Sequence, residues 1–346
     1  MAKHMNRTGR LAYLTRNYKS TAYGGAKARV DIEDILASEG AVNLGLPRTF
    51  HRNKIVDYIR NLGSIIHFAF AVKKGDTVII QYPVKKYYRF ICRTARRKGA
   101  RTISLIHDLG SFRRKRLTPE EEIRKLSLSD AVIAANENTR AWLCEHGLKI
   151  PVALQTAWDY LSDEQPPSTP APADSCIFVG HLKESRNGFL YKFPPQLDIH
   201  LYGTGAPAET PANIHTHGFA TPDAIISGGE GRYGLIWYGM TLAHDNTGYI
   251  GEYIGYCNPH KLGLYMLAGK PVIIWKGAGA ASFVEREGIG LTTDTLENLD
   301  RQLAGISEER YAEMVANTRR VAGRMKKGGF ITDAIREAES LLEKQN

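Results

Sequence analysis

The residues whose types and spacing favour chemistry most clearly are Asn258-Pro259-His260-Lys261, directly before an apolar stretch. Asn is a frequent N-cap residue and Pro suits the first helical position, so the run predicts a helix over residues 258–268. Lys261 then falls in the first helical turn, where the helix dipole disfavours a cation. A bound anion would account for a lysine there, and the alternative is an amphipathic helix whose lysine has no ligand.

A second polar pair, His107 and Asp108, ends an apolar run typical of a buried strand, residues 102–107. In a parallel sheet the carboxyl ends of the strands meet at one edge, where ligands bind. Asp108 there could take the proton of an attacking hydroxyl, with His107 orienting the carboxylate or the hydroxyl. The alternative is that Asp108 caps a loop or a helix.

A glycine-containing loop follows the first expected strand. Ser20 and Thr21 precede Gly24 and Gly25 in this loop. The glycines let the backbone approach a ligand, and the helix expected next offers unpaired N–H groups to an acceptor or a diphosphate. The spacing matches neither a dinucleotide fingerprint nor a P-loop, so an ordinary tight turn is the alternative.

A similar loop begins the second half of the chain, where Gly180 ends an apolar run and Lys183 and Arg186 follow. Either cation could meet a diphosphate, and a plain surface loop is the alternative. Between the halves, Trp158 and Asp159 could stack against a sugar and bind its hydroxyls. They could equally pack where two domains meet.

The carboxylates show no pairing that would hold a metal beside a diphosphate. Asp245 and Glu252 come nearest to the Asn258 run, and they stand apart. We therefore expect binding without a metal or other cofactor, with cationic side chains and helix ends neutralising the diphosphate. The four cysteines lack paired spacing, so we expect neither a zinc site nor a disulfide framework, and a reduced compartment.

Short apolar runs alternate with helical patterns, which predicts α/β domains with parallel sheets. The expected strands are residues 11–15, 77–82, 102–107, 130–135, 152–155, 176–180, 199–202, 214–217, 234–238 and 271–275. The expected helices are residues 25–38, 119–126, 258–268, 281–287 and 307–344, the last interrupted near 326–329.

The proline-rich residues 165–174 indicate a linker between two domains. We expect an acceptor-binding Rossmann-like domain over residues 1–164 and a nucleotide-sugar-binding one over residues 175–346. The last helix is a candidate to pack back on the first domain. Two such domains facing across an interdomain cleft would hold a donor and an acceptor.

The chain has 346 residues and a formal net charge of +10, with basic clusters at residues 93–101 and 113–116. The clusters are either a solvated face or a surface for an anion, such as a nucleotide, a lipid diphosphate or a membrane leaflet. They lack interleaved aromatics, so nucleic acid is not expected as a partner. No run reaches the roughly 20 apolar residues of a membrane span, and no secretory leader is visible, which favours a cytoplasmic protein.

Taken together, these stretches resemble a family of bacterial glycosyltransferases with the GT-B fold. The family includes β-1,6-galactofuranosyltransferases of surface-polysaccharide synthesis and the glucosyltransferase that extends N-acetylglucosamine on adhesin glycoproteins. The resemblance spans residues 15–293. It is carried by His107-Asp108, by residues 158–161, by the loop from Gly180 and above all by residues 258–272.

The resemblance implies a UDP-sugar donor bound by the second domain. It assigns the donor diphosphate to Lys261, with Tyr256 and Asn258 lining the same pocket, and the nucleobase to residues 218–223, which include Phe219. It also implies inversion at the anomeric carbon and assembly as a homo-oligomer.

The loop from Gly180 departs from the family pattern. An Asn and a basic residue common in that loop are here His181 and Glu184. Lys183 and Arg186 therefore both remain candidates for a further contact with the diphosphate.

Residues and resemblance together predict a hexosyltransferase that moves galactofuranose, or as second choice glucose, from UDP to a glycan hydroxyl. The expected acceptor is a glycan, and a lipid-linked glycan is one form of this prediction. The protein would then work at the inner face of the membrane. Two alternatives stay open. One is a retaining GT-B transferase or a UDP-sugar epimerase-like enzyme, and the other is a non-catalytic nucleotide- or glycan-binding scaffold.

Overall fold

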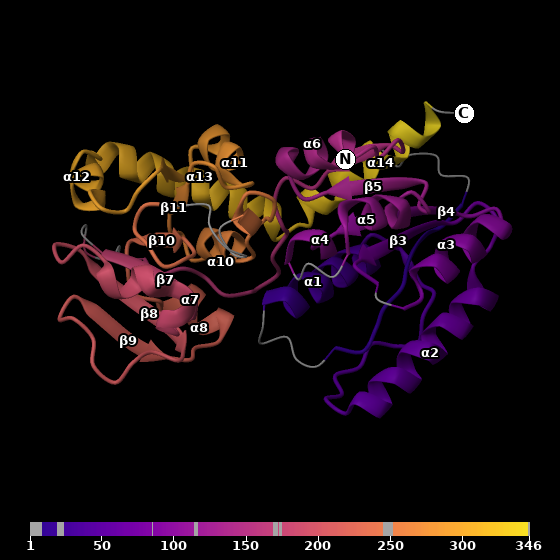
Figure 1. Ribbon diagram of the computed structural model, residues 1–346, viewed down its shortest axis with the longest axis horizontal. Coiled ribbons are helices and arrows are strands. Elements are labelled where there is room, and N and C mark those ends of the chain that lie inside the picture. The colour runs from indigo at the N-terminus through magenta and orange to yellow at the C-terminus, as the bar shows by residue number, and fades with distance from the viewer. Residues whose placement is uncertain are drawn as a thin grey trace. The chain divides into compact units, whose positions relative to one another are not determined.

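The chain forms two compact units, which Figure 1 shows as ribbons. The computed structural model describes residues 9–18, 24–84, 86–113, 117–168, 172, 175–244 and 252–344. The first unit comprises Met1–Gln155 and Ile331–Asn346, and the second comprises Thr156–Phe330. Each contains one parallel six-stranded sheet accompanied by helices, which confirms the predicted fold class of two Rossmann-like α/β domains.

The division between the units falls at Gln155, before the proline-rich residues 165–174 that were expected as the linker. Ala157 and Tyr160 are fully buried in the core of the second unit, so packing assigns their segment to that unit. The predicted boundary at residue 164 followed composition, whereas the structural boundary follows this burial.

The last helix, α14 (Gly329–Glu343), returns to the first unit. There the carboxylate of Glu337 accepts a hydrogen bond from the main-chain N–H of Leu154 at 3.1 Å. The predicted interruption near residues 326–329 separates this helix from α13 (Glu308–Met325).

The sheet of the first unit has the order β2-β1-β3-β4-β5-β6, with all neighbours parallel. Its strands are β1 (Leu11–Tyr13), β2 (Val42–Asn43), β3 (Thr77–Tyr82), β4 (Arg101–Ile106), β5 (Ala131–Ala134) and β6 (Val152–Leu154). Its helices are α1 (Gly24–Ser38), α2 (Lys54–Ala71), α3 (Tyr88–Arg97), α4 (Gly110–Arg113), α5 (Pro119–Leu126), α6 (Glu137–Glu145) and α14. Strand β2 and helices α2, α3, α4 and α6 were not predicted.

Local sequence signals decide where α5 begins. Thr118 caps the helix, and its side chain and that of Glu121 form a reciprocal capping box, with proline at the first helical position. The predicted helix over residues 119–126 is therefore confirmed.

The sheet of the second unit has the order β12-β11-β10-β7-β8-β9, again parallel throughout. Its strands are β7 (Ser175–His181), β8 (Asp198–Thr204), β9 (Ile214–Gly218), β10 (Tyr233–Ile236), β11 (Val272–Trp275) and β12 (Gly290–Thr293). Its further helices are α7 (Glu184–Asn187), η1 (Gly188–Lys192), α8 (Pro222–Gly228), α10 (Lys261–Leu267), α11 (Ala281–Glu287) and α12 (Leu299–Ala304). The chain starts at β7, runs outward to β9 and returns to β10 on the other side of β7. Such a reversal is where doubly wound sheets bind ligands.

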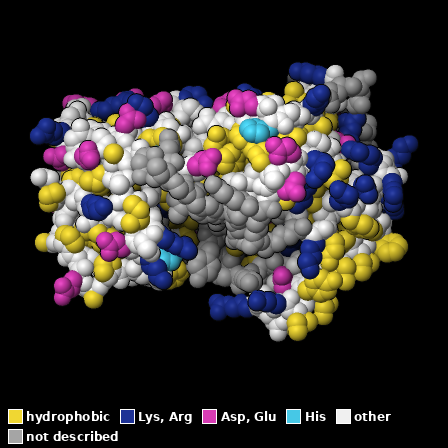
Figure 2. All heavy atoms as spheres, in the orientation of Figure 1, with side chains coloured by type: hydrophobic (Ala, Val, Ile, Leu, Met, Phe, Trp, Pro, Cys, Tyr) yellow, Lys and Arg dark blue, Asp and Glu magenta, His cyan; other side chains and the backbone are white. Residues whose placement is uncertain are grey.

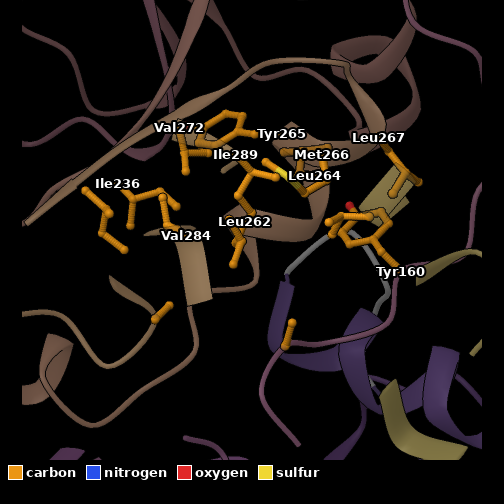
Figure 3. Packing of buried hydrophobic residues seen from close by; sticks show 14 of the residues in the cluster. Tyr160, Ile236, Leu262, Leu264, Tyr265, Met266, Leu267, Val272, Val284 and Ile289 are labelled. Carbon is orange, nitrogen blue, oxygen red and sulfur yellow. The ribbon is translucent and has the colours of Figure 1, made fainter. Parts of the chain in front are cut away.

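Helix α10 is embedded in the core of the second unit. Figure 3 shows the apolar side chains of this helix packed against the strands and helices around it. The helix contributes Leu262, Leu264, Tyr265, Met266 and Leu267, and its neighbours contribute Tyr160, Ile236, Val272, Val284 and Ile289. Burial on this scale fixes the position of the helix, and hence of the lysine at its start. Within the described residues, no helix is long and apolar enough to cross a bilayer.

Candidate functional site

The side chain of Lys261 lies at the reversal point of the sheet in the second unit. Its Nζ stands 3.8 Å from the ring centroid of Phe178 in β7 and 4.5 Å from that of Tyr238, which follows β10. Gly180 also borders the ammonium group, because a Cβ atom placed at this glycine would lie 3.7 Å from the Nζ of Lys261. Strands β7 and β10 are the pair between which the strand order reverses. Lys261 therefore occupies the place where such sheets bind ligands.

Helix α10 is fixed against both strands by Tyr265, one turn beyond Lys261. The Tyr265 hydroxyl accepts a hydrogen bond from the N–H of Val179 at 3.0 Å and donates to the carbonyl of Leu235 at 3.4 Å. Its ring fills the space that Gly234 leaves open, since a Cβ atom there would lie 2.3 Å from the ring. Residues four apart share a helix face, so this anchoring also directs Lys261 toward the strands.

The ammonium group of Lys261 is buried, and no hydrogen-bond acceptor among the described residues contacts it. Removal from water disfavours the charged form and lowers the pKa of Lys261 to about 7. The two aromatic faces offset part of this cost, since a desolvated cation–π contact contributes about 2 kcal/mol. A lysine with three N–H donors, removed from water and without an acceptor in the described part of the chain, is suited to bind an anion.

Helix α10 begins later than predicted, because His260 occupies the N-cap position and the helix starts at Lys261. The expectation that Asn258 caps this helix is wrong. Its side-chain amide donates to the carbonyl of Thr156 at 3.0 Å, and its own carbonyl accepts from the indole N–H of Trp158 at 3.0 Å. Asn258 thus ties the approach to the helix to the segment that enters the second unit.

The predicted acceptor residues Trp158 and Asp159 are buried in the second unit, Trp158 with 5% of its surface exposed. The carboxylate of Asp159 accepts a hydrogen bond from the N–H of Phe330 at 3.1 Å. The chain crosses between the units just before Thr156 and just after Phe330, so Asp159 links the two crossings. The acceptor role expected for this pair stays a prediction.

The other predicted donor residues follow strand ends or lie close to Lys261 in the sequence. Lys183 directly precedes α7 and Arg186 lies within it, both exposed and shortly after β7. Phe219 follows β9 and is exposed. Tyr256 is partly buried, and Pro259 is buried beside the start of α10. Their contacts with a donor stay predictions.

The first unit contains a cavity of about 930 Å³ at the carboxyl ends of its central strands. Asp108 lines this cavity after β4, and Gly25 lines it at the start of α1. The adjacent His107 turns to the sheet instead, with its Nε2 2.8 Å from the side-chain oxygen of Gln81. Polar residues at strand ends thus surround a space large enough for a sugar, with the predicted base among them.

The remaining residues of the first glycine loop are only partly described. Gly24 is the first residue of α1, whereas Ser20 and Thr21 lie outside the described residues. Their predicted contact with an acceptor or diphosphate therefore stays a prediction.

Sequence reasoning missed the aromatic rings beside Lys261 and the cations that line the first cavity. Phe178 sits in an apolar run that is indistinguishable from core, so its sequence carries no signal. Arg16 and Arg29 both line the cavity. Arg16 comes shortly after the first expected strand, so the rule on strand carboxyl ends could have found it.

A group of residues of metal-binding type lies on the outer strands of the second unit. His200, His217 and Glu230 place ligand atoms within 4.8 Å of one another, and His200 Nδ1 lies 3.0 Å from His217 Nε2. The sequence did not predict this group. Asp245, one of the two carboxylates weighed for a metal, lies outside the described residues.

Two family models match the chain, one for each half. The model described as Glucosyltransferase 3-like, N-terminal domain matches residues 12–157, and the model for the C-terminal domain matches residues 176–338. The chain belongs to the Glucosyltransferase 3-like family. This confirms the family resemblance drawn from His107-Asp108, the Gly180 loop and the Asn258 run.

Curated relatives of this Glucosyltransferase 3-like chain cover most of its length. It is 24% identical over 318 residues to β-1,6-galactofuranosyltransferase WbbI of Escherichia coli (strain K12), covering 90% of this chain and 93% of the relative. It is 27% identical over 281 residues to glucosyltransferase 3 of Streptococcus gordonii, covering 78% and 82%. The Glucosyltransferase 3-like chain is therefore a glycosyltransferase, as predicted.

Solved structures share the fold of this Glucosyltransferase 3-like chain. Anabaena Alr3699/HepE in complex with UDP aligns with a TM-score of 0.59 at 15% identity, covering 96% of this chain and 99% of that one. The apo form of the lipopolysaccharide outer core galactosyltransferase WaaB aligns with a TM-score of 0.59 at 14% identity and the same coverage. At this identity the likeness supports the GT-B fold.

Proposed function

We propose that this glycosyltransferase moves a hexosyl unit from a UDP-sugar to a hydroxyl group of a glycan. The observation that carries the proposal is the buried ammonium group of Lys261, which lies between two aromatic rings where the strand order reverses. The diphosphate of a nucleotide would supply the oxygen atoms that the described residues do not. A fold neighbour was solved with UDP, which agrees with this choice of nucleotide.

In the proposed reaction Asp108 removes the proton of the acceptor hydroxyl as the oxygen bonds to the anomeric carbon of the donor. The bond between that carbon and the UDP oxygen breaks, and its electron pair leaves with UDP. Lys261 stabilises the negative charge that develops on the diphosphate, with Lys183 or Arg186 as a further cation. Attack opposite the leaving group inverts the anomeric centre. The proposed reaction uses no metal.

The transferred sugar is galactofuranose as first choice and glucose as second, which follows the names of the two relatives. A screen of UDP release over UDP-galactofuranose, UDP-glucose, UDP-galactose and UDP-N-acetylglucosamine decides between them. One donor is expected to release UDP only when an acceptor is present. Tight UDP binding without release in every combination would instead indicate a binding scaffold. Retained configuration in the product NMR spectrum would contradict the inverting displacement.

The proposal includes a lipid-linked glycan as acceptor and peripheral contact with an anionic membrane. The outer face of α2 supports the membrane contact, because Ile55, Ile59, Ile66 and Phe70 are all exposed on it. Figure 2 shows hydrophobic side chains gathered over α2, with Lys and Arg side chains near them. An apolar helix face beside cations suits the interface of an anionic bilayer. The cytoplasmic location and the homo-oligomeric state stay predictions.

A further inference from the structure

Two arginines line one wall of the cavity in the first unit and bond there to main-chain carbonyl groups. Arg29 donates to the carbonyls of Gln81 at 2.8 Å and Tyr82 at 3.2 Å. Arg16 donates to the same Gln81 carbonyl at 2.5 Å and to that of Pro83 at 3.4 Å. Among the described residues neither guanidinium lies within ion-pair distance of a carboxylate, although Asp108 and Glu33 attract Arg29 from farther away.

A lysine extends this wall along the same stretch of chain. The ammonium group of Lys125 donates to the carbonyl of Val84 at 3.2 Å and lies over the ring of Tyr82, 5.3 Å from its centroid. Three cations therefore converge on four successive carbonyl groups at the end of β3. We call Arg16, Arg29 and Lys125 the cation wall.

The positive charges of the cation wall are partly buried, and nearby carboxylates offset only part of them. Burial, reinforced by the nearby Arg16, lowers the pKa of Arg29 to about 10. Burial also lowers the pKa of Lys125, against the attraction of Glu122. Among the described lining residues, Lys54 and Lys86 bring the cationic side chains to five, against two carboxylates. An excess of positive charge in a partly buried space favours an anionic ligand.

Two carboxylates near the wall accept hydrogen bonds from neutral side chains. Asp57 accepts hydrogen bonds from the side chains of Asn17 and Asn61, both at 2.9 Å. Glu33, behind the wall, accepts from the hydroxyls of Thr15 and Tyr18, both at 2.5 Å, and lies 3.9 Å from the guanidinium of Arg48. Asp108, the second carboxylate of the cavity, attracts Arg29 electrostatically. Asp108 and Glu33 both attract Arg29, yet among the described lining residues the cations still outnumber the carboxylates.

We propose that the cation wall is a subsite that binds a phosphate group of the acceptor substrate. The proposal rests on the proposed function in taking this cavity as the acceptor site, and it adds the chemical class of the acceptor. The carbonyl groups hold the two guanidinium planes in place before the ligand arrives. Guanidinium groups pair with phosphate oxygens in a fixed geometry, which suits this role. The phosphate could belong to a soluble sugar phosphate or to a lipid carrier.

The test is binding of inorganic phosphate by isothermal titration calorimetry in the full-length Lys261→Met variant, which removes the proposed nucleotide site. Adding Arg16→Gln and Lys125→Gln is expected to weaken phosphate binding at least tenfold. The matched control adds Lys73→Gln and Lys74→Gln, which remove the same charge from exposed positions after α2 and should leave affinity unchanged. Equal phosphate affinity with and without the wall would overturn the proposal, as would absence of binding in Lys261→Met.

A second arm distinguishes the two sources of phosphate. Dodecyl phosphate binding at least tenfold more tightly than inorganic phosphate, with no binding of dodecyl maltoside, indicates a lipid carrier. Equal affinities for the two phosphates indicate a soluble sugar phosphate.

The failure of this proposal can be told from failure of the proposed function. The wall variants in the otherwise native protein should bind UDP normally, because Lys261 lies in the other unit. A protein that binds UDP through Lys261 but shows no phosphate site would overturn the subsite alone.

Discussion

At the scale of single residues, Lys261 is expected to destabilise the free protein while it enables donor binding. Its pKa of about 7 lies below the usual 10.5, so the charged form is disfavoured in the folded state. That cost is present in full below about pH 7 and declines as pH rises toward the unfolded value. Lys261→Met is therefore expected to raise the unfolding temperature and to weaken UDP binding about a hundredfold, or about 3 kcal/mol.

Lys270→Met is the matched control for this prediction. Lys270 is also buried, but its ammonium group donates a hydrogen bond to the carbonyl of Gly231. Its replacement should leave UDP affinity unchanged and should not raise the unfolding temperature. Thermal unfolding and calorimetric UDP titration check both variants. A less stable Lys261→Met protein with native UDP affinity would show that this lysine is structural.

The same side chain predicts how donor binding responds to pH. The diphosphate requires charged Lys261, whose pKa in the free protein is about 7, so proton uptake accompanies binding at higher pH. UDP affinity is expected to fall up to about tenfold for each pH unit above 7. Lys261→Arg, which stays charged, should flatten the dependence. UDP titrations between about pH 6 and about pH 9 measure it, and a flat wild-type profile would contradict the assignment.

At the scale of elements, helix α2 has two apolar faces with different roles. Its inner side buries Ile65 and Phe68, and Ile65 also lines the cavity. Its outer side exposes Ile59 and Ile66, seven residues apart and hence on one face. An amphipathic helix normally turns its apolar stripe toward the core, so this exposed apolar face needs a cover.

Ile59→Glu with Ile66→Glu is expected to lower binding to vesicles rich in anionic lipid at least tenfold. The added charges would enter the apolar interface and repel the lipid headgroups. The control is Val42→Glu, a similar change at an exposed position of β2. Vesicle sedimentation measures binding, and size-exclusion chromatography shows whether the double variant instead dissociates an oligomer. Dissociation with native vesicle binding would assign the face to a second copy of the chain.

Helix α2 also shows why part of the fold escaped prediction from the sequence. Strands such as β3 and β4 are recognisable in the sequence as short apolar runs, and α5 is recognisable by its capping box. Residues 54–71 do carry a helical pattern, with Asp57, Asn61 and Ser64 on one face, which the sequence reasoning overlooked. The start of α10 was misplaced because Asn258 bonds to Thr156, a contact between residues distant in the sequence.

The candidate site likewise contains residues that the sequence predicts and residues that it does not. Lys261 was predicted because its place near a helix start conflicts with local preference, which is visible in the sequence. The aromatic rings of Phe178 and Tyr238 come to it from β7 and from the segment after β10, and only the sheet order brings them together. The cation wall likewise depends on α1, α5 and the end of β3 meeting in one unit.

At the scale of the whole molecule, the chain enters the second unit at Thr156 and leaves it after Phe330. Consecutive helices α13 and α14 therefore belong to different units. The hydrogen bond from the Phe330 N–H to Asp159 joins both crossings within the second unit. Ligand binding to one unit and packing of the last helix on the other should then affect separate unfolding transitions.

Ile335 in α14 gives the test of this division, because its side chain is buried in the first unit. Ile335→Ala is expected to destabilise that unit by about 2–4 kcal/mol through the cavity it leaves. In differential scanning calorimetry it should lower one transition, while UDP raises the other through binding to the second unit. Glu343→Gln, at an exposed position of the same helix, should move neither. A single transition shifted by both UDP and Ile335→Ala would mean that the last helix couples the two units into one folding domain.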